Sequence, residues 1–358
     1  MTSTQGPSDP TSPAKREGDP ASSTPTITTR MILTLALPSL GALIAEPLFT
    51  VIDSTMVGHL GTPQLAGLGI ASTVLNTAVG LFIFLAYSTT SLAGRHLGAG
   101  RRDRAIRSGV EAMWLAGGLG ALAAILLAVF ASPLLTWLGA DAATMPHALA
   151  YLRASAPGLV GMFVVLAATG TLRGLQDTRT PLVAASVGAA FNAVANWVLM
   201  YPLDLGVAGS GLGTAITQTL MAAFLGWMIV RAARREGVSL RPSTDGLFGA
   251  ALEGAPLLVR TLALRVALLA TLSAVTAIST QALAAHQIVW TLWTFAAYVL
   301  DALAIAAQAL AGFTTGTGER GAMRPLLRTL SRWGIGFGVA VGVAMAITAP
   351  WITRIFTT

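Results

Sequence analysis

Nine long apolar stretches dominate this sequence, and each is long enough to cross the hydrocarbon core of a bilayer as a helix. They cover residues 31–57, 68–93, 108–131, 148–171, 181–203, 207–231, 250–277, 283–312 and 333–356. A spanning helix needs about 20 mostly apolar residues, and within lipid only helices and closed barrels satisfy every backbone polar group. The sequence therefore predicts an all-α integral membrane protein.

The charged residues support this fold and orient it. Only 10% of the residues are charged, whereas about a quarter are in a typical soluble domain. All of the 22 lysines and arginines except Arg153, Arg260, Arg265 and Arg354 lie before the first stretch or in the segments that follow the second, fourth, sixth and eighth. By the positive-inside rule these segments and the N-terminus are cytoplasmic, in a multi-pass protein of the cell membrane. Membrane topology thus accounts for the net charge of +7, and no nucleic-acid partner is expected.

Several classes of function are disfavoured by residues that the sequence lacks. Residues 1–28 are rich in Pro, Ser and Thr without apolar periodicity, which predicts a disordered cytoplasmic tail. The chain has no cysteine, so it offers no thiolate nucleophile and no cysteine metal site. Its four histidines are scattered, and no Ser-His-Asp or P-loop pattern is present. We therefore expect neither an enzyme nor a bound metal or cofactor.

An internal repeat divides the chain. An offset of 218 residues places Pro38 on Pro256, and the run 92–94 on the identical run 310–312. Chance similarity between two Ala/Leu-rich stretches is the alternative. Six spans separate the copies, so both have the same orientation. This predicts two parallel six-helix lobes, an N-lobe over 29–235 and a partial C-lobe over 236–358. About nine of an expected twelve helices are present, which predicts a fragment or a truncated form.

The first stretch contains two acids, Glu46 and Asp53, which share a helical face with Thr50 between them. An ionised carboxylate in mid-membrane costs roughly 2.5–3.5 kcal/mol, so such a group can take up and release a proton near neutral pH. Pro38 and Pro47 each remove a backbone hydrogen bond and allow the helix to bend beside the acids. We predict that Asp53 and Glu46 couple a cation to a conformational change. A static buried acid bonded to a neighbouring helix is the alternative.

Polar and aromatic residues of the first and fifth stretches are candidates for the wall of a substrate cavity. Five residues are expected to line it: Thr50, Asn192, Asn196, Trp197 and Tyr201. The two asparagines lie four residues apart on one face, where their amides can contact a substrate or bond to another helix. Asn76 and Gln218 are interpreted as links between helices.

The second copy has different polar residues. The repeat mate of Asp53 is Thr271, so the acid has no symmetric twin. Instead, Arg265 lies in the seventh stretch, and Asp301 and Gln308 lie on one face of the eighth. The sequence favours an ion pair between Arg265 and Asp301 over a second ion site.

Four segments together carry a family resemblance: DSTMVGHLG at 53–61, LRGLQDTRTP at 172–181, LAAHQI at 283–288, and LDA at 300–302 with Gln308. They resemble the signatures of multidrug and toxic compound extrusion (MATE) transporters, especially the DinF branch. The resemblance implies two six-helix lobes around a central cavity. It also implies rocker-switch export of drugs or other organic, often cationic, compounds in exchange for H+ or Na+, with Asp53 as the coupling residue.

The sequence departs from the family pattern at two places, and other functions stay open. Many members have an Asp where this chain has Asn196, and often an acid where it has Gln308. Sodium coupling is less favoured, because one aspartate with amides offers few hard oxygen ligands. A flippase for lipid-linked saccharides and a non-transporting scaffold are the alternatives. The expected partners are the bilayer and a small-molecule substrate, and a monomer is expected.

Overall fold

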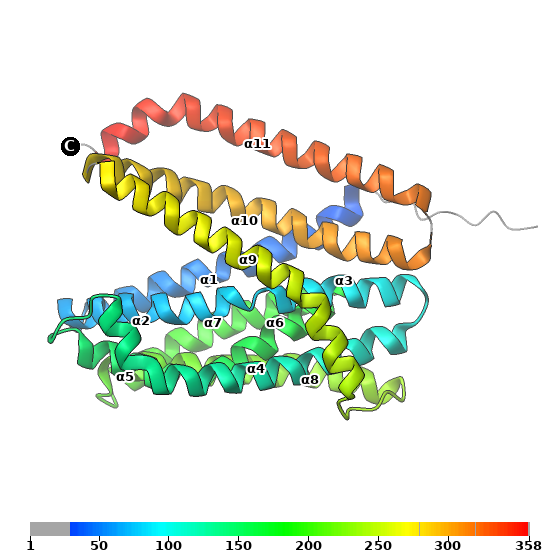
Figure 1. The fold of residues 1–358 in the computed structure, drawn as a ribbon, viewed down its shortest axis with the longest axis horizontal. Coiled ribbons are helices and arrows are strands. Elements are labelled where there is room, and N and C mark those ends of the chain that lie inside the picture. Colours follow the sequence, from blue (N-terminus) through cyan, green and yellow to red (C-terminus); the bar gives the residue numbers. More distant parts are fainter. Residues whose placement is uncertain (1–28, 279, 319, 357–358) are drawn as a thin grey trace, which may run out of the picture.

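The computed structural model describes residues 29–278, 280–318 and 320–356, and their regular secondary structure is entirely α-helical (Figure 1). The tail predicted for 1–28 lies outside these residues. The helices are α1 Thr29–Gly58, α2 Thr62–Leu81, α3 Phe84–Gly98, α4 Arg102–Trp137, α5 Met145–Ser155, α6 Gly158–Gly174, α7 Arg179–Met200, α8 Gly206–Arg235, α9 Thr244–Ile278, α10 Thr280–Thr317 and α11 Arg320–Phe356. The predicted all-α fold is confirmed.

The number of spans differs slightly from the nine predicted. In the part of the chain that the structure describes, 7 segments are long and apolar enough to cross a membrane, and 8 if the bent pair α5–α6 is one span. These eight match the first eight predicted stretches. The ninth stretch is helical in α11, but side chains beyond residue 347 are not described, so its membrane crossing stays a prediction.

Two of the spans are broken, which apolar patterning did not predict. The stretch 68–93 contains a break between α2 and α3 at Phe82, whose ring packs 4.6 Å from that of Phe163 and 5.9 Å from that of Phe84. The stretch 148–171 bends by 52° between α5 and α6, next to Pro157. Proline lacks the N–H that would continue the hydrogen-bond ladder, so the helix bends there.

Helix α10 packs tightly against α3 through glycines. A side chain added to Gly98 would overlap the carbonyl oxygen of Phe313, and one added to Gly316 would overlap that of Arg95. Small residues of this kind let two helix backbones approach closely in a membrane. Gly98 and Gly316 are repeat mates, 218 residues apart. The two copies therefore meet through corresponding positions of corresponding helices.

The linker between α8 and α9 is held along α4 by three side chains. Arg107 Nη1 donates to the carbonyl oxygen of Ser239 at 2.9 Å, and Trp114 Nε1 donates to that of Leu240 at 3.0 Å. Glu111 Oε1 accepts from Ser243 Oγ at 2.6 Å. Residues 107, 111 and 114 recur at helical spacing on one face of α4, so this face contacts the linker at several positions.

Candidate functional site

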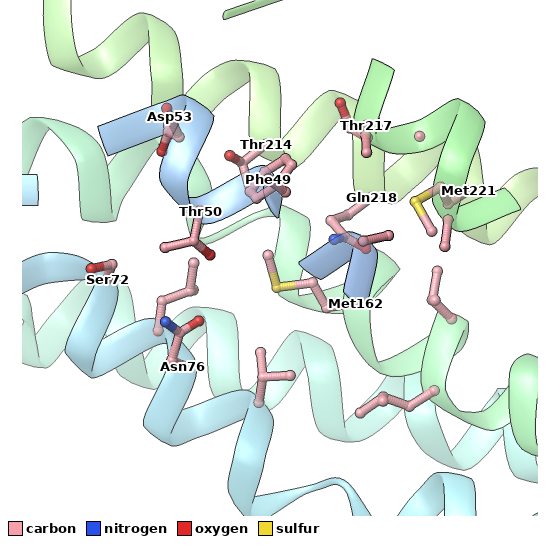
Figure 2. Close-up of a pocket in the computed structure, with 18 of the residues that line it drawn as sticks. Phe49, Thr50, Asp53, Ser72, Asn76, Met162, Thr214, Thr217, Gln218 and Met221 are labelled. Atoms are coloured by element: carbon pink, nitrogen blue, oxygen red, sulfur yellow. The ribbon is translucent and has the colours of Figure 1, made fainter. Parts of the chain in front are cut away.

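A cavity of about 230 Å³ lies within the bundle formed by α1–α8. Helices α1, α2, α5, α6, α7 and α8 contribute to its wall, and Figure 2 shows Thr50, Asn76 and Gln218 around the space between these helices. The polar residues include Thr50, Asp53, Ser72, Asn76, Thr214 and Gln218. Asp53 is the one charged residue among the described residues that line this cavity. The wall is otherwise largely apolar, with Phe49 of α1 and Met162 of α6 among its members.

Asp53 is buried and bonded to two other helices. Its side chain is on the inner face of α1, and only 4% of the residue is exposed. Its Oδ1 accepts a hydrogen bond from Asn196 Nδ2 of α7 at 2.9 Å and one from Ser210 Oγ of α8 at 2.6 Å. One carboxylate thus connects α1 to two consecutive helices whose donors lie 143 and 157 residues away in the sequence.

The network continues from Asp53 along α7 and α8. Asn196 Nδ2 also donates to Asn192 Oδ1 at 2.9 Å, and Asn192 Nδ2 donates to Thr217 Oγ1 at 3.3 Å. Thr217 Oγ1 in turn donates to the carbonyl oxygen of Gly213 at 2.7 Å. A change in the protonation or position of Asp53 is therefore felt by both helices that face it.

One acceptor atom in this network has no hydrogen-bond donor in the described part of the chain. Asn196 Oδ1 is buried and has no hydrogen-bond partner within the described part of the chain. It occupies the space that a side chain at Gly213 would fill. A buried acceptor without a partner loses its hydration and gains nothing in return. The oxygen is thus available to a proton donor or a small cation beside Asp53.

The electrostatics of Asp53 are unusual, because no cationic side chain in the described part of the chain pairs with it. Among the described residues Asp53 takes part in no ion pair, and both of its hydrogen-bond donors are neutral. An ionised carboxylate in mid-membrane costs roughly 2.5–3.5 kcal/mol. A bound proton or a small monovalent cation would remove that cost. The structure shows no group of three or more His, Asp or Glu residues in its described part, which sets this arrangement apart from a multi-carboxylate metal site.

The structure unites some of the residues predicted for the site and separates others. Thr50 lines the cavity. Asn192 and Asn196 do not; both are buried, and Asn196 bonds to Asp53. Trp197 does not line the cavity, because it is 55% exposed on the outer side of α7. Tyr201 also lies outside the lining, and its hydroxyl donates to the carbonyl oxygen of Met56 at 2.7 Å.

The second predicted acid, Glu46, falls where the structure does not describe side chains. Its backbone belongs to α1, but its side chain is outside the described set. The proposal that Glu46 assists Asp53 therefore remains a prediction.

The sequence reasoning missed the contribution of α8. Ser210, Thr214 and Thr217 follow one another at spacings of four and three residues, so they share a helical face toward α1 and α7. The glycines around them suggested close packing alone. Asn76 and Gln218, interpreted as links between helices, instead line the cavity. The spacing of the three hydroxyl residues in α8 could have indicated a polar face there.

The polar residues of the second copy do not assemble as expected. The ion pair between Arg265 and Asp301 is absent from the described residues, and Arg265 Nη2 lies instead against Gly80 of α2. Asp301 is exposed. Gln308 Oε1 is buried, without a hydrogen-bond partner in the part of the structure that is described. This region does not form a counterpart of the Asp53 network.

Comparison with known proteins gives consistent matches over most of the chain. The family model MatE matches residues 38–198 and 256–358. Protein DETOXIFICATION 44, chloroplastic, from Arabidopsis thaliana is 31% identical over 341 residues, which are 91% of this chain and 65% of that protein. DNA damage-inducible protein F from Escherichia coli (strain K12) is 30% identical over 308 residues, 83% of this chain and 66% of that protein.

Solved structures share the fold. A crystal structure of MATE in the bent conformation aligns with a TM-score of 0.84 at 22% identity, and covers 92% of this chain and 74% of that one. A MATE structure in the straight conformation aligns with a TM-score of 0.81 over the same shares. The chain spans 65% of the length of DETOXIFICATION 44 and 66% of that of DNA damage-inducible protein F.

Proposed function

Because the chain belongs to the MATE family of membrane transporters, we propose that it contains the coupling site of a secondary antiporter. The antiporter exports drugs or other organic, often cationic, compounds in exchange for H+ or Na+. Members of the family are transporters rather than enzymes, and they need no catalytic cofactor. Multidrug resistance protein MdtK from Klebsiella pneumoniae (strain 342) matches at 27% identity over 207 residues, and its name supports the substrate class.

One observation carries the proposal. Asp53 is buried in the largely apolar wall of a cavity within the bundle, and two neutral donors on two other helices are its hydrogen-bond partners. An acid in this setting is suited to bind a proton or another mobile cation, because the described residues supply no counter-ion. An acid of a purely structural role gains more from a fixed cationic partner.

The geometry supports a mechanism in which cation binding and helix position are linked. A proton or Na+ at Asp53 competes for Oδ1 with the donors Asn196 and Ser210, which join α1 to α7 and α8. Loss of these bonds frees α1, which contains Pro38 and Pro47 and can therefore bend. Bending of α1 alters the cavity wall and expels the substrate, while the two lobes rock between their two openings.

The available energy is sufficient for export. Entry of one charge down a membrane potential of 100 mV releases roughly 2.3 kcal/mol. Since 1.36 kcal/mol corresponds to a tenfold ratio, this is about a fifty-fold gradient of an electrically neutral exchange partner. One cation at Asp53 per cycle is therefore enough to drive export of a neutral compound, whereas one-for-one exchange with a monovalent cation moves no net charge and is driven by the H+ or Na+ concentration gradient alone.

Transport in vesicles tests the proposal. Efflux of a cationic dye would be measured in proteoliposomes with an imposed H+ gradient, an imposed Na+ gradient, or neither. We expect Asp53→Asn to abolish gradient-driven efflux, whereas Asp141→Asn, at an exposed acid in the α4–α5 loop, leaves it intact. Full transport with unchanged pH dependence in Asp53→Asn would contradict the proposed role of this residue.

The alternative functions find less support. A flippase for lipid-linked saccharides would need basic groups for the anionic phosphates of its substrate, and no Lys or Arg is among the residues described in the cavity wall. A non-transporting scaffold would show no gradient-driven efflux of the dye, with or without Asp53. The vesicle experiment therefore separates the antiporter from both alternatives.

We further propose that the protein is a monomer of the cell membrane with its N-terminus in the cytoplasm. Because the chain has no cysteine, single cysteines report topology directly. In whole cells a membrane-impermeant maleimide should label Asp141→Cys in the α4–α5 loop but not Glu236→Cys in the α8–α9 linker. The opposite pattern would reverse the orientation.

A further inference from the structure

A second cavity, of about 320 Å³, lies between α7 and α8 on the outer side of the bundle. We call it the α7–α8 groove. All of the described residues that line it, except Thr217, are apolar. Five of them form its mouth: Val183, Val187 and Phe191 of α7, and Leu220 and Phe224 of α8. Each is at least 39% exposed, so the groove is open to the surroundings.

The medium around this groove is the hydrocarbon of the bilayer. Both α7 and α8 are candidate membrane spans, and the exposed apolar residues recur along α7 at the spacing of one helical face. A hydrophobic surface of this size within a span is covered by acyl chains, because water is absent at that depth. The groove therefore accepts a hydrocarbon chain.

The α7–α8 groove and the cavity that contains Asp53 share part of their wall. Gly188, Thr217 and Met221 line both. Met221 Sδ lies in the place of a side chain at Gly188, 2.5 Å from the position that a Cβ atom would take. Figure 2 shows Met221 and Thr217 on α8 beside Gln218, at one end of the cavity. The partition at this point therefore consists of the flexible side chain of Met221, which packs on Gly188, a residue without a side chain.

Methionine is suited to a movable partition. Its unbranched thioether has three rotatable bonds and adapts to irregular spaces at low energetic cost. Rotation of Met221 away from Gly188 would remove its side chain from this part of the partition. On the cavity side, the hydroxyl of Thr217 belongs to the same hydrogen-bond network as Asp53. An apolar path from the bilayer thus ends at a polar, acidic site.

We propose that the α7–α8 groove is a lateral entrance through which a single-chain cationic amphiphile passes from the bilayer into the cavity. The inference rests on the proposed function and specifies its substrate class. The hydrocarbon chain occupies the groove, while the cationic head passes Met221 and reaches the Asp53 network. The apolar mouth and the acidic interior match the two ends of such a molecule.

Competing transport of two quaternary ammonium ions tests the entrance. Dodecyltrimethylammonium has the chain, and tetraethylammonium lacks it. Val187→Trp narrows the mouth, so the ratio of long-chain to short-chain efflux should fall about tenfold, the size of effect that a misfit in a hydrophobic pocket produces. Val194→Trp, on the lipid-facing side of the same helix outside the groove, should leave that ratio unchanged. Equal ratios in both variants and the parent protein would overturn the proposal.

The partition is tested separately. Met221→Ala removes the side chain that lies against Gly188, so it should raise the long-chain to short-chain ratio. A fall in the ratio would show that Met221 holds the chain in place rather than excludes it, and would overturn its role as a partition. Size-exclusion profiles and helical circular dichroism identify any variant that is misfolded.

Binding separates failure of the entrance from failure of the proposed function. A fluorophore on Phe224→Cys, unique in this cysteine-free chain, would be quenched by a dodecyl ammonium that carries a nitroxide on its chain. Quenching that Val187→Trp reduces supports the entrance even if Asp53→Asn leaves efflux unchanged. Quenching by nitroxide-labelled bilayer lipid that the amphiphile does not displace would show a lipid plug and overturn the proposal.

Discussion

Helices α1 and α9 begin the two copies of the repeat, yet they use their corresponding positions differently. Asp53 of α1 is buried and bonded to α7 and α8. Its repeat mate, Thr271 of α9, is exposed, and its hydroxyl donates to the carbonyl oxygen of Ala267 in its own helix at 2.9 Å. The same helical framework thus supports an interhelical polar network in one copy and a local bond in the other.

The following helices differ in continuity as well. In the first copy a break at Phe82 and Ile83 divides the second span into α2 and α3. In the second copy α10 is continuous from Thr280 to Thr317. The repeat mates of the two break residues are Leu300 and Asp301. In the first copy, aromatic packing of Phe82 against Phe163 fixes the break. Divergence between the copies therefore includes backbone geometry.

Exchange of residues between the copies is the strongest test of this difference. Asp53→Thr installs the residue of the second copy, and we expect it to abolish gradient-driven efflux because the titratable group is lost. Thr271→Val removes only a bond within one helix and should leave efflux unchanged. Both are measured in proteoliposomes. Loss of efflux in Thr271→Val would show that the two copies share the chemistry.

A second acid beside Asp53 would increase the difference in titratable groups between the two copies. Asn196→Asp places a carboxylate within hydrogen-bond distance of Asp53, where two anions repel each other and favour a shared proton. We expect more protons to enter per substrate exported, as measured with a pH-sensitive dye inside vesicles. Asn76→Asp, on the α2 side of the same cavity, is the matched control for added charge. Unchanged stoichiometry in Asn196→Asp would separate this position from the coupling step.

The contact between the copies should respond to an added methyl group. Gly98→Ala pushes against the carbonyl oxygen of Phe313, and overpacking of this kind costs typically about 1–3 kcal/mol. Gly334→Ala in α11 has open space around it and replaces a poor helix former, a change worth up to about 1 kcal/mol in favour of the helix. Thermal unfolding in detergent compares the two. Equal stability of both variants would refute close packing at Gly98.

The smallest effect is expected in the linker between the copies. Trp114→Phe removes the hydrogen bond to the carbonyl oxygen of Leu240 and keeps most of the apolar ring, so stability should fall by about 0.5–1.5 kcal/mol. Trp137→Phe, at an exposed tryptophan with no such bond among the described residues, serves as control in the same unfolding assay. A loss in both variants alike would assign the effect to the ring rather than to the bond.

Much of this architecture was predictable from the sequence, because apolar length and arginine position are strong signals in a membrane protein. The same signals are insensitive to a local break, so the interruptions at Phe82 and Pro157 were missed. The shared face of Asn192 and Asn196 was anticipated from helical spacing, whereas their position next to Asp53 depends on how α1 and α7 pack. The assignment of Trp197 to the cavity was not borne out by the geometry, since neighbouring residues on a helix point about 100° apart.

The role of α8 shows why the rest was harder to predict. Ser210, Thr214 and Thr217 share a face, but one sequence does not specify which neighbour that face meets. The partner of Asp53 at 2.6 Å is supplied by a helix 157 residues away. Side-chain hydroxyls in membrane helices often bond to their own backbone, as Thr217 also does, so their presence alone does not identify a site.

The glycine contact between α3 and α10 has a consequence for how the molecule tolerates change. Because Gly98 and Gly316 meet the opposite helix through backbone atoms, no rotamers are frozen at these two positions when the helices join, and none is released when they part. The closest part of the contact therefore costs no side-chain entropy. Any side chain larger than hydrogen at either position alters the fit of both repeats at once.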